Sequence, residues 1–91
     1  MSEYEERETA LEFPCEFPIK AMGRADREFA MRVFEIVQRH VPELGAQQLR
    51  TTASRRGGFV SVTVTFTARS QGQLDRIYID LNDDEQVLMT L

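Results

Sequence analysis

The sequence predicts a single α+β domain with the element order β-α-β-β-α-β, and three observations lead to it. The chain has 91 residues, which is enough for one domain and no more. Apolar residues alternate with polar ones in four segments, as in strands. In two further segments they recur at three- and four-residue steps, as in amphipathic helices.

The first half of the chain contains one strand and one helix. Residues 17–22 alternate in polarity, and Gly23 ends this strand. Asp26 is the expected N-cap of the helix, and Pro42 and Gly45 end it. The residues of its apolar face are Phe29, Ala30, Val33, Ile36, Val37, His40 and Val41.

A hairpin follows the first helix. Residues 47–54 alternate weakly and suit the edge of a sheet. Residues 55–58 end in two glycines, which supply the positive φ that a hairpin turn favours. Residues 59–68 form the clearest strand, with apolar side chains on one face and hydroxyl side chains on the other.

The last quarter of the chain contains a second helix and a final strand. Ser70 and Gln73 form a capping box, and the apolar stripe that follows predicts a helix to about Leu81. Residues 82–84 are an expected turn, and residues 86–91 the last strand.

This order is typical of a ferredoxin-like split β-α-β unit. Each helix has one apolar face, so both should cover the same face of a four-stranded antiparallel sheet. The strands joined by each helix are expected to pair in parallel. Residues 11–91 form this domain. Residues 1–10 are an expected disordered acidic tail that contributes nothing to folding, because they offer little apolar surface.

Composition points to a cytoplasmic protein. The single cysteine, Cys15, has no internal disulfide partner, which fits a reducing compartment. No apolar run approaches the ~20 residues that a membrane span needs, and the first ten residues do not resemble a signal peptide.

The charge is unevenly distributed around a net value of −4. Residues 44–74 contain no acid, and the arginines among them are Arg50, Arg55, Arg56 and Arg69. One interpretation is solvated surface charge, and the other is a basic hairpin that binds an anion. Residues 75–85 reverse the balance with five acids against one arginine.

No catalytic, metal-binding or cofactor-binding site is expected, and the chain is not expected to be an enzyme. His40 is the only histidine, and its position suits a packing or capping role. The acidic run 83–85 lacks the ligand spacing of a calcium loop. A phosphatase loop is weighed at Gly23 and Arg24, but one glycine stands there in place of a glycine-rich run.

RNA-recognition modules share this element order but stack bases on aromatic residues of the open sheet face. Here the corresponding strand positions carry Ser61, Thr63, Thr65 and Thr67. Phe59 is the one aromatic residue in place to stack. Nucleic acid is therefore not the expected partner, and binding through the basic hairpin is kept as the alternative.

The chain resembles the YbeD-like family of small bacterial proteins of unknown function. The similarity covers residues 11–91. It is carried by Leu11, Glu12, Phe13, Pro14, Phe17, Lys20, Met22, Gly23, Val37, Gln38, Arg39, His40, Pro42, Ser54, Gly57, Phe59, Ser61, Val62 and Leu91.

This resemblance implies a ferredoxin-like fold close to the ACT domains that regulate amino-acid metabolism. Such domains form dimers and bind small effectors near the first strand-to-helix loop. The matching loop here carries the candidate effector residues Met22, Gly23, Arg24 and Asp26. The resemblance therefore suggests a non-enzymatic regulatory or interaction domain, with a small effector or a metabolic enzyme as its partner.

The final strand indicates self-association. It has no charged side chain and has apolar residues on both faces, although the helices can cover only one face. Its backbone also lies at a sheet edge, where unpaired donors and acceptors invite a partner strand. A homodimer is expected at Val87, Leu88 and Met89. The other interpretation is that Leu88 packs on the preceding loop or on the segment around Pro14.

Overall fold

The structure is a computed structural model, and it describes residues 11–91. The elements in chain order are β1 (Cys15–Arg24), α2 (Phe29–Gln38), the 3-10 helix η1 (Ala46–Gln48), β2 (Leu49–Ala53), β3 (Phe59–Ala68), α3 (Gln71–Asp83) and β4 (Met89–Thr90). The predicted order is confirmed, and the expected tail lies outside the described residues. No helix within these residues is both long and apolar enough to cross a membrane.

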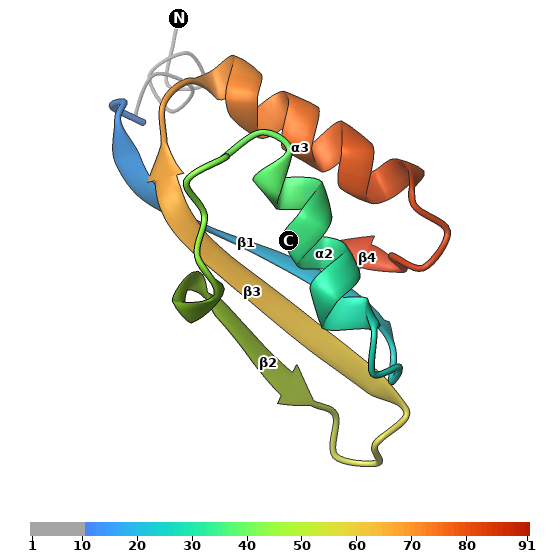
Figure 1. The fold of residues 1–91 in the computed structure, drawn as a ribbon. Helices are drawn as coiled ribbons and strands as arrows, with labels where there is room; N and C mark the ends of the chain where they lie inside the picture. The colour runs from blue at the N-terminus through green and yellow to red at the C-terminus, as the bar shows by residue number, and fades with distance from the viewer. Residues whose placement is uncertain (1–10) are drawn as a thin grey trace, which may run out of the picture.

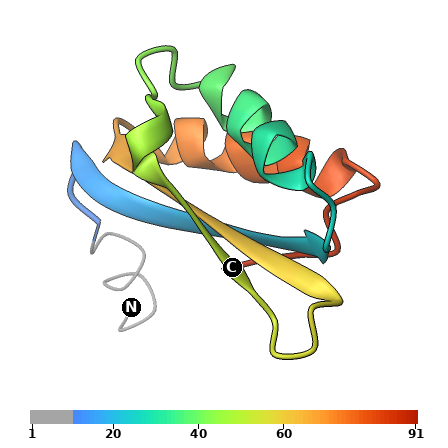
Figure 2. The same ribbon diagram turned by 60° about the horizontal axis from the view of Figure 1, so that its bottom comes forward.

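The four strands form one sheet in the order β2-β3-β1-β4, which is the ferredoxin-like arrangement (Figure 1). Every neighbouring pair is antiparallel. The expected parallel pairing across each helix is wrong, because β3 lies between β1 and β2, and β1 lies between β3 and β4. Both helices cover one face of the sheet and leave the other face open, as expected (Figure 2).

The core lies between the sheet and the two helices. β3 occupies the predicted residues 59–68, and its inward side chains Val62, Val64 and Phe66 are at most 1% exposed. They pack with buried residues of α2 and α3 in one cluster. The predicted face assignment of β3 is therefore confirmed, and its serine and threonine side chains belong to the open face.

β1 is longer than the six residues that the alternation predicts. It pairs with β3 along ten residues, including Pro18 opposite Thr65. The N–H of Lys20 points towards β4, where it donates to the Leu91 carbonyl at 3.2 Å. The nitrogen of Pro18, two residues earlier, points the same way but lies beyond the end of β4. Its missing N–H therefore breaks no ladder bond.

Three of the four helix ends differ from the predicted positions by two or three residues. α2 ends at Gln38, so His40 and Val41 of the predicted apolar face follow the helix. The N-cap of α2 is Glu28, not Asp26. Asp26 stabilises the turn before the helix, because its Oδ1 accepts the Glu28 N–H at 2.9 Å in an Asx turn. α3 continues past Leu81 to Asp83, so two of the three expected turn residues are helical.

The strands at the two sheet edges are shorter than predicted. Residues 47 and 48 belong to η1, which leaves β2 with five residues. The hairpin turn contains Gly57 at φ 76°, as expected. β4 has only two residues in place of six, although Leu88 and Leu91 also donate backbone hydrogen bonds to β1, each at 2.8 Å.

Gln73 connects the start of α3 to the segment after α2. Its Oε1 accepts the Arg69 N–H at 2.7 Å, and its Nε2 donates to the His40 carbonyl at 3.0 Å. The Ser70 Oγ accepts the Gln73 N–H at 3.1 Å, so one half of the capping box is confirmed. The other half is wrong, since the Gln73 side chain bonds Arg69 and not Ser70.

Candidate functional site

The candidate effector residues lie mostly in β1 and not in a loop, because the strand continues past the expected end at Gly23 to Arg24. This segment is closely packed. Gly23 is buried, and a Cβ at this position would lie 2.5 Å from the Phe29 ring and 2.7 Å from the Gln86 carbonyl oxygen. The Ala25 N–H also donates to the Gly58 carbonyl at 3.1 Å. The glycine therefore permits a close backbone approach. No space remains against it for a ligand.

The other three candidate effector residues do not converge on one point. Met22 and Arg24 lie on the open face of the sheet, because they pair with open-face residues of β3. The Arg24 guanidinium lies 6.0 Å from the centre of the Phe59 ring, a cation-π distance. Asp26 is engaged in its turn at the start of α2. Arg24 and Asp26 thus serve separate structural contacts.

The four arginines of the candidate basic hairpin are not all neighbours. Arg55 and Arg56 lie in the turn between β2 and β3, and Arg50 lies on β2. Arg69 follows the far end of β3, roughly 30 Å along the strand from the turn. Its guanidinium Nη2 donates to the Glu43 carboxylate at 3.0 Å. Arg69 is therefore separate from the hairpin.

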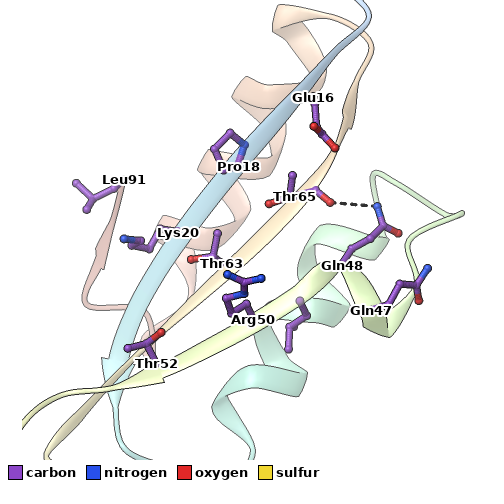
Figure 3. Close-up of a pocket in the computed structure, with 11 residues that line it drawn as sticks. Glu16, Pro18, Lys20, Gln47, Gln48, Arg50, Thr52, Thr63, Thr65 and Leu91 are labelled. Carbon is purple, nitrogen blue, oxygen red and sulfur yellow. Dashed lines mark hydrogen bonds between the residues drawn. The ribbon is translucent and has the colours of Figure 1, made fainter.

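A hollow of about 850 Å³ lies on the open face of the sheet, and we call it the open-face hollow (Figure 3). Its lining includes Pro18, Lys20, Gln48, Arg50, Thr63 and Leu91. Figure 3 shows Thr63 between Arg50 and Lys20, with Leu91 beyond Lys20. Threonines 63 and 65 were assigned to the open face from the sequence, but Lys20 was not recognised as a site residue.

The charges of the folded part are divided between the two sides of the molecule. By strand register, the charged residues of the open face are Glu16, Lys20, Arg24 and Arg50. They sum to +2. The acidic run 83–85 and the acids of α2 and α3 belong to the helical layer. The net charge of −4 therefore does not describe the open face, which is locally basic.

The candidate dimer edge is partly available. Val87 belongs to the core at 9% exposure, so it is not a surface residue. Leu88, Met89 and Leu91 are 53%, 52% and 65% exposed. We call these three residues the β4 edge. The Tyr78 hydroxyl donates to the Leu91 carbonyl at 3.1 Å and ties this edge to α3. Burial raises the pKa of Tyr78, which favours the protonated donor.

The remaining chemical candidates form structural contacts. The His40 Nε2 lies 2.6 Å from the Asp80 Oδ2, a link between the end of α2 and α3. In the acidic run, Asp84 accepts a hydrogen bond of 2.7 Å from the Arg32 Nε. Cys15 is partly buried and free. Within residues 11–91, no group of three or more His, Cys, Asp or Glu side chains is placed to hold a metal ion.

A smaller apolar groove of about 230 Å³ lies beside α2. Its lining residues are Arg27, Ala30, Met31, Phe34, Ala46 and Leu49. The Met31 side chain is 57% exposed there. This groove was not expected from the sequence, because it joins one flank of α2 to η1 and the start of β2.

The fold and its surfaces define a small α+β domain of the ferredoxin-like class with an open, basic sheet face. The chain belongs to the DUF493 family, described as "Protein of unknown function", whose model matches residues 8–91. The resemblance to the YbeD-like family is thereby confirmed.

Several relatives carry the description UPF0250 protein. One from Nitrosomonas europaea is 39% identical over 84 residues, which cover 92% of this chain and 97% of the relative. One from Ectopseudomonas mendocina is 46% identical over 82 residues and 89% of each chain. One from Neisseria gonorrhoeae is 38% identical over the full length of both.

A solved structure supports the fold. The solution structure of protein HP0495 from H. pylori has a TM-score of 0.71 to this chain, with 12% sequence identity. The match covers all of this chain and 96% of that protein. At this identity the likeness concerns the fold alone.

Proposed function

We propose that this protein is a non-enzymatic interaction domain that binds a partner chain through the β4 edge. The partner expected before any other is a second copy of the same chain. The observation that carries the proposal is the exposure of Leu88, Met89 and Leu91 at the last strand of the sheet. Three large apolar side chains, each more than half exposed within four residues, are typical of a binding surface.

The backbone of β4 supports the same proposal. β4 is the last strand in the sheet order, so within residues 11–91 no strand pairs with its outer side. Such an edge can add a strand from another chain, with backbone hydrogen bonds supplying affinity and side chains supplying selectivity. Neither the preceding loop nor the segment around Pro14 covers Leu88, which stays 53% exposed.

The small size of the β4 edge implies a weak association. A standard stable interface buries about 800 Å² on each partner, and a two-residue strand with three apolar side chains supplies only part of that area. Regulation of a metabolic partner fits an interaction of this strength. Association would be favoured where a partner or an effector adds contacts to those of β4.

Leu88→Lys is expected to abolish dimer formation in sedimentation velocity at tens of micromolar protein. Each partner would then place an ammonium against the apolar edge, which should raise the dissociation constant by about tenfold or more, or about 1.4 kcal/mol. Met31→Lys is the matched control, because Met31 is similarly exposed but lies on α2. A monomeric wild-type chain would refute self-association, and dissociation by Met31→Lys alone would move the interface to the α2 groove.

The alternative function is polyanion binding through the hairpin, and the exposure of Arg55 and Arg56 in the turn between β2 and β3 favours it. We expect no micromolar affinity for RNA or DNA at physiological salt, since open-face aromatics for base stacking are limited to Phe59. Gel shifts would test this expectation. Micromolar binding that is lost in Arg55→Ala/Arg56→Ala, with a salt slope reduced by about one per arginine, would favour the alternative.

A further inference from the structure

A row of three side chains crosses the middle of the open sheet face. Lys20 of β1 and Arg50 of β2 are both register partners of Thr63 on β3. The backbones of β1 and β2 are therefore about 10 Å apart, with the Thr63 hydroxyl on β3 between them. Side chains as long as lysine and arginine reach across such a distance, so both cations can contact one group bound over Thr63.

Within residues 11–91, neither cation of this row forms an ion pair with a carboxylate side chain. The ion pairs within residues 11–91 join Arg32 to Asp84, His40 to Asp80, and Arg69 to Glu43. Glu16 is the acid of the open-face hollow, but it lies four residues from Lys20 along β1, or about 13 Å. Among the described residues, no acidic side chain is therefore paired with Lys20 or Arg50, and both positive charges face the hollow.

The walls of the hollow suit a small molecule. Its volume of about 850 Å³ lies within the usual range for ligand pockets. The Gln48 amide is held rigidly on one wall, since its Oε1 accepts the Gly45 N–H at 2.8 Å and its Nε2 donates to the Thr65 carbonyl at 3.1 Å. Pro18 and Leu91 add apolar surface on the β1 and β4 side.

We propose that the open-face hollow binds a small phosphorylated molecule, with its phosphate held by Lys20, Thr63 and Arg50. A phosphate monoester carries nearly two negative charges and accepts several hydrogen bonds, which matches two cations and a hydroxyl. The guanidinium of Arg50 suits bidentate contact with phosphate oxygens, and the Lys20 ammonium acts as a point charge. The remainder of the molecule lies against Pro18 and Leu91.

This site shares Leu91 with the β4 edge, and it is separate from the hairpin turn. It does not use Leu88 or Met89, so the dimer-disrupting variant Leu88→Lys is expected to leave pyrophosphate binding intact. It also does not use Arg55 or Arg56, which lie beyond the end of β2. Variants at Leu88, Arg55 and Arg56 therefore serve as controls for variants of the open-face hollow.

The test is an amide NMR titration of the full chain with inorganic pyrophosphate, against sodium chloride at equal ionic strength. We expect saturable shifts at Lys20, Gln48, Arg50 and Thr63 with pyrophosphate only. Lys20→Gln and Arg50→Gln should each weaken binding about tenfold or more, while Arg55→Gln/Arg56→Gln should leave it unchanged. The four substituted side chains, Lys20, Arg50, Arg55 and Arg56, are exposed, so we expect unchanged melting temperatures. Such melting temperatures would confirm that the variants are folded.

Three outcomes would overturn the proposal. The first is a linear response that sodium chloride reproduces, which would mean non-specific screening. The second is saturable binding that the Lys20 and Arg50 variants leave unaltered. The third is far tighter binding of a single-stranded oligonucleotide than of pyrophosphate with shifts centred on residues 55–58, which would assign the basic charge to a nucleic acid instead.

Discussion

Phe66→Ala is expected to lower the free energy of unfolding by roughly 3–5 kcal/mol, the usual cost of truncating a buried phenylalanine. Phe66 is 1% exposed and is among the largest fully buried side chains of the described residues. It lies opposite Phe17 on β1 and packs in the cluster shared by the sheet and both helices. The truncation would remove apolar contact and leave a cavity where these three elements meet.

The measurement is urea unfolding followed by circular dichroism. A small domain has a total stability of only about 5–15 kcal/mol, so the Phe66 variant should be largely unfolded at modest urea concentrations. Thr63→Ala and Thr65→Ala are the controls from the same strand, because their side chains face the open side. We expect each to cost far less. Threonine variants that destabilise the domain more than Phe66→Ala would show that the faces of β3 are inverted.

Gly23→Ala is the second substitution with a large expected effect, a loss of about 1–3 kcal/mol through overpacking. The added methyl group would meet the Phe29 ring at 2.5 Å and the Gln86 carbonyl oxygen at 2.7 Å. A side chain at the end of a flexible stem could move aside, but Phe29 is 1% exposed in the core. The start of α2 and the segment before β4 must therefore shift to make room.

Gly58→Ala is the matched control for Gly23→Ala. A Cβ at Gly58 meets no atom within 4 Å, and its φ lies outside the positive region. We expect this variant to match the wild type or to gain up to ~1 kcal/mol, since alanine restricts the unfolded chain. Equal midpoints in urea for both alanine variants would show that the contacts of Gly23 are not needed for packing. A drop for Gly58 alone would contradict the open space around it.

Local patterns in the sequence were sufficient for the elements with the most regular periodicity. Residues 60–68 of β3 alternate without interruption, and the structure places the strand at the predicted residues. Ser70 was also identified as the N-cap of α3 from its type and spacing. Such features depend on neighbours a few residues away, because the period of the side chains determines which of them can be buried together.

Elements held by distant contacts were predicted less well. β4 shortens to two residues, and Val87 turns into the core. The alternation of residues 86–91 suggested a six-residue strand, but the length of β4 depends on how many of these residues pair with β1. The hairpin turn, by contrast, is short enough to indicate the register of β2 on β3. The backbones of Ser54 and Phe59 are hydrogen-bonded, and counting four residues along each strand from this pair places Arg50 opposite Thr63.

The sequence by itself determined the α+β class, the order of the elements and the apolar side of the two helices and of β3, because these follow from residue spacing within single segments. Only the tertiary structure decided which charged residues are neighbours. It brought Lys20 beside Thr63 through the register of β1 on β3, and it separated Arg69 from Arg55 by the length of β3. Register is set by the packing of segments far apart in the chain, and a shift of one residue would move Lys20 to the opposite face of the sheet.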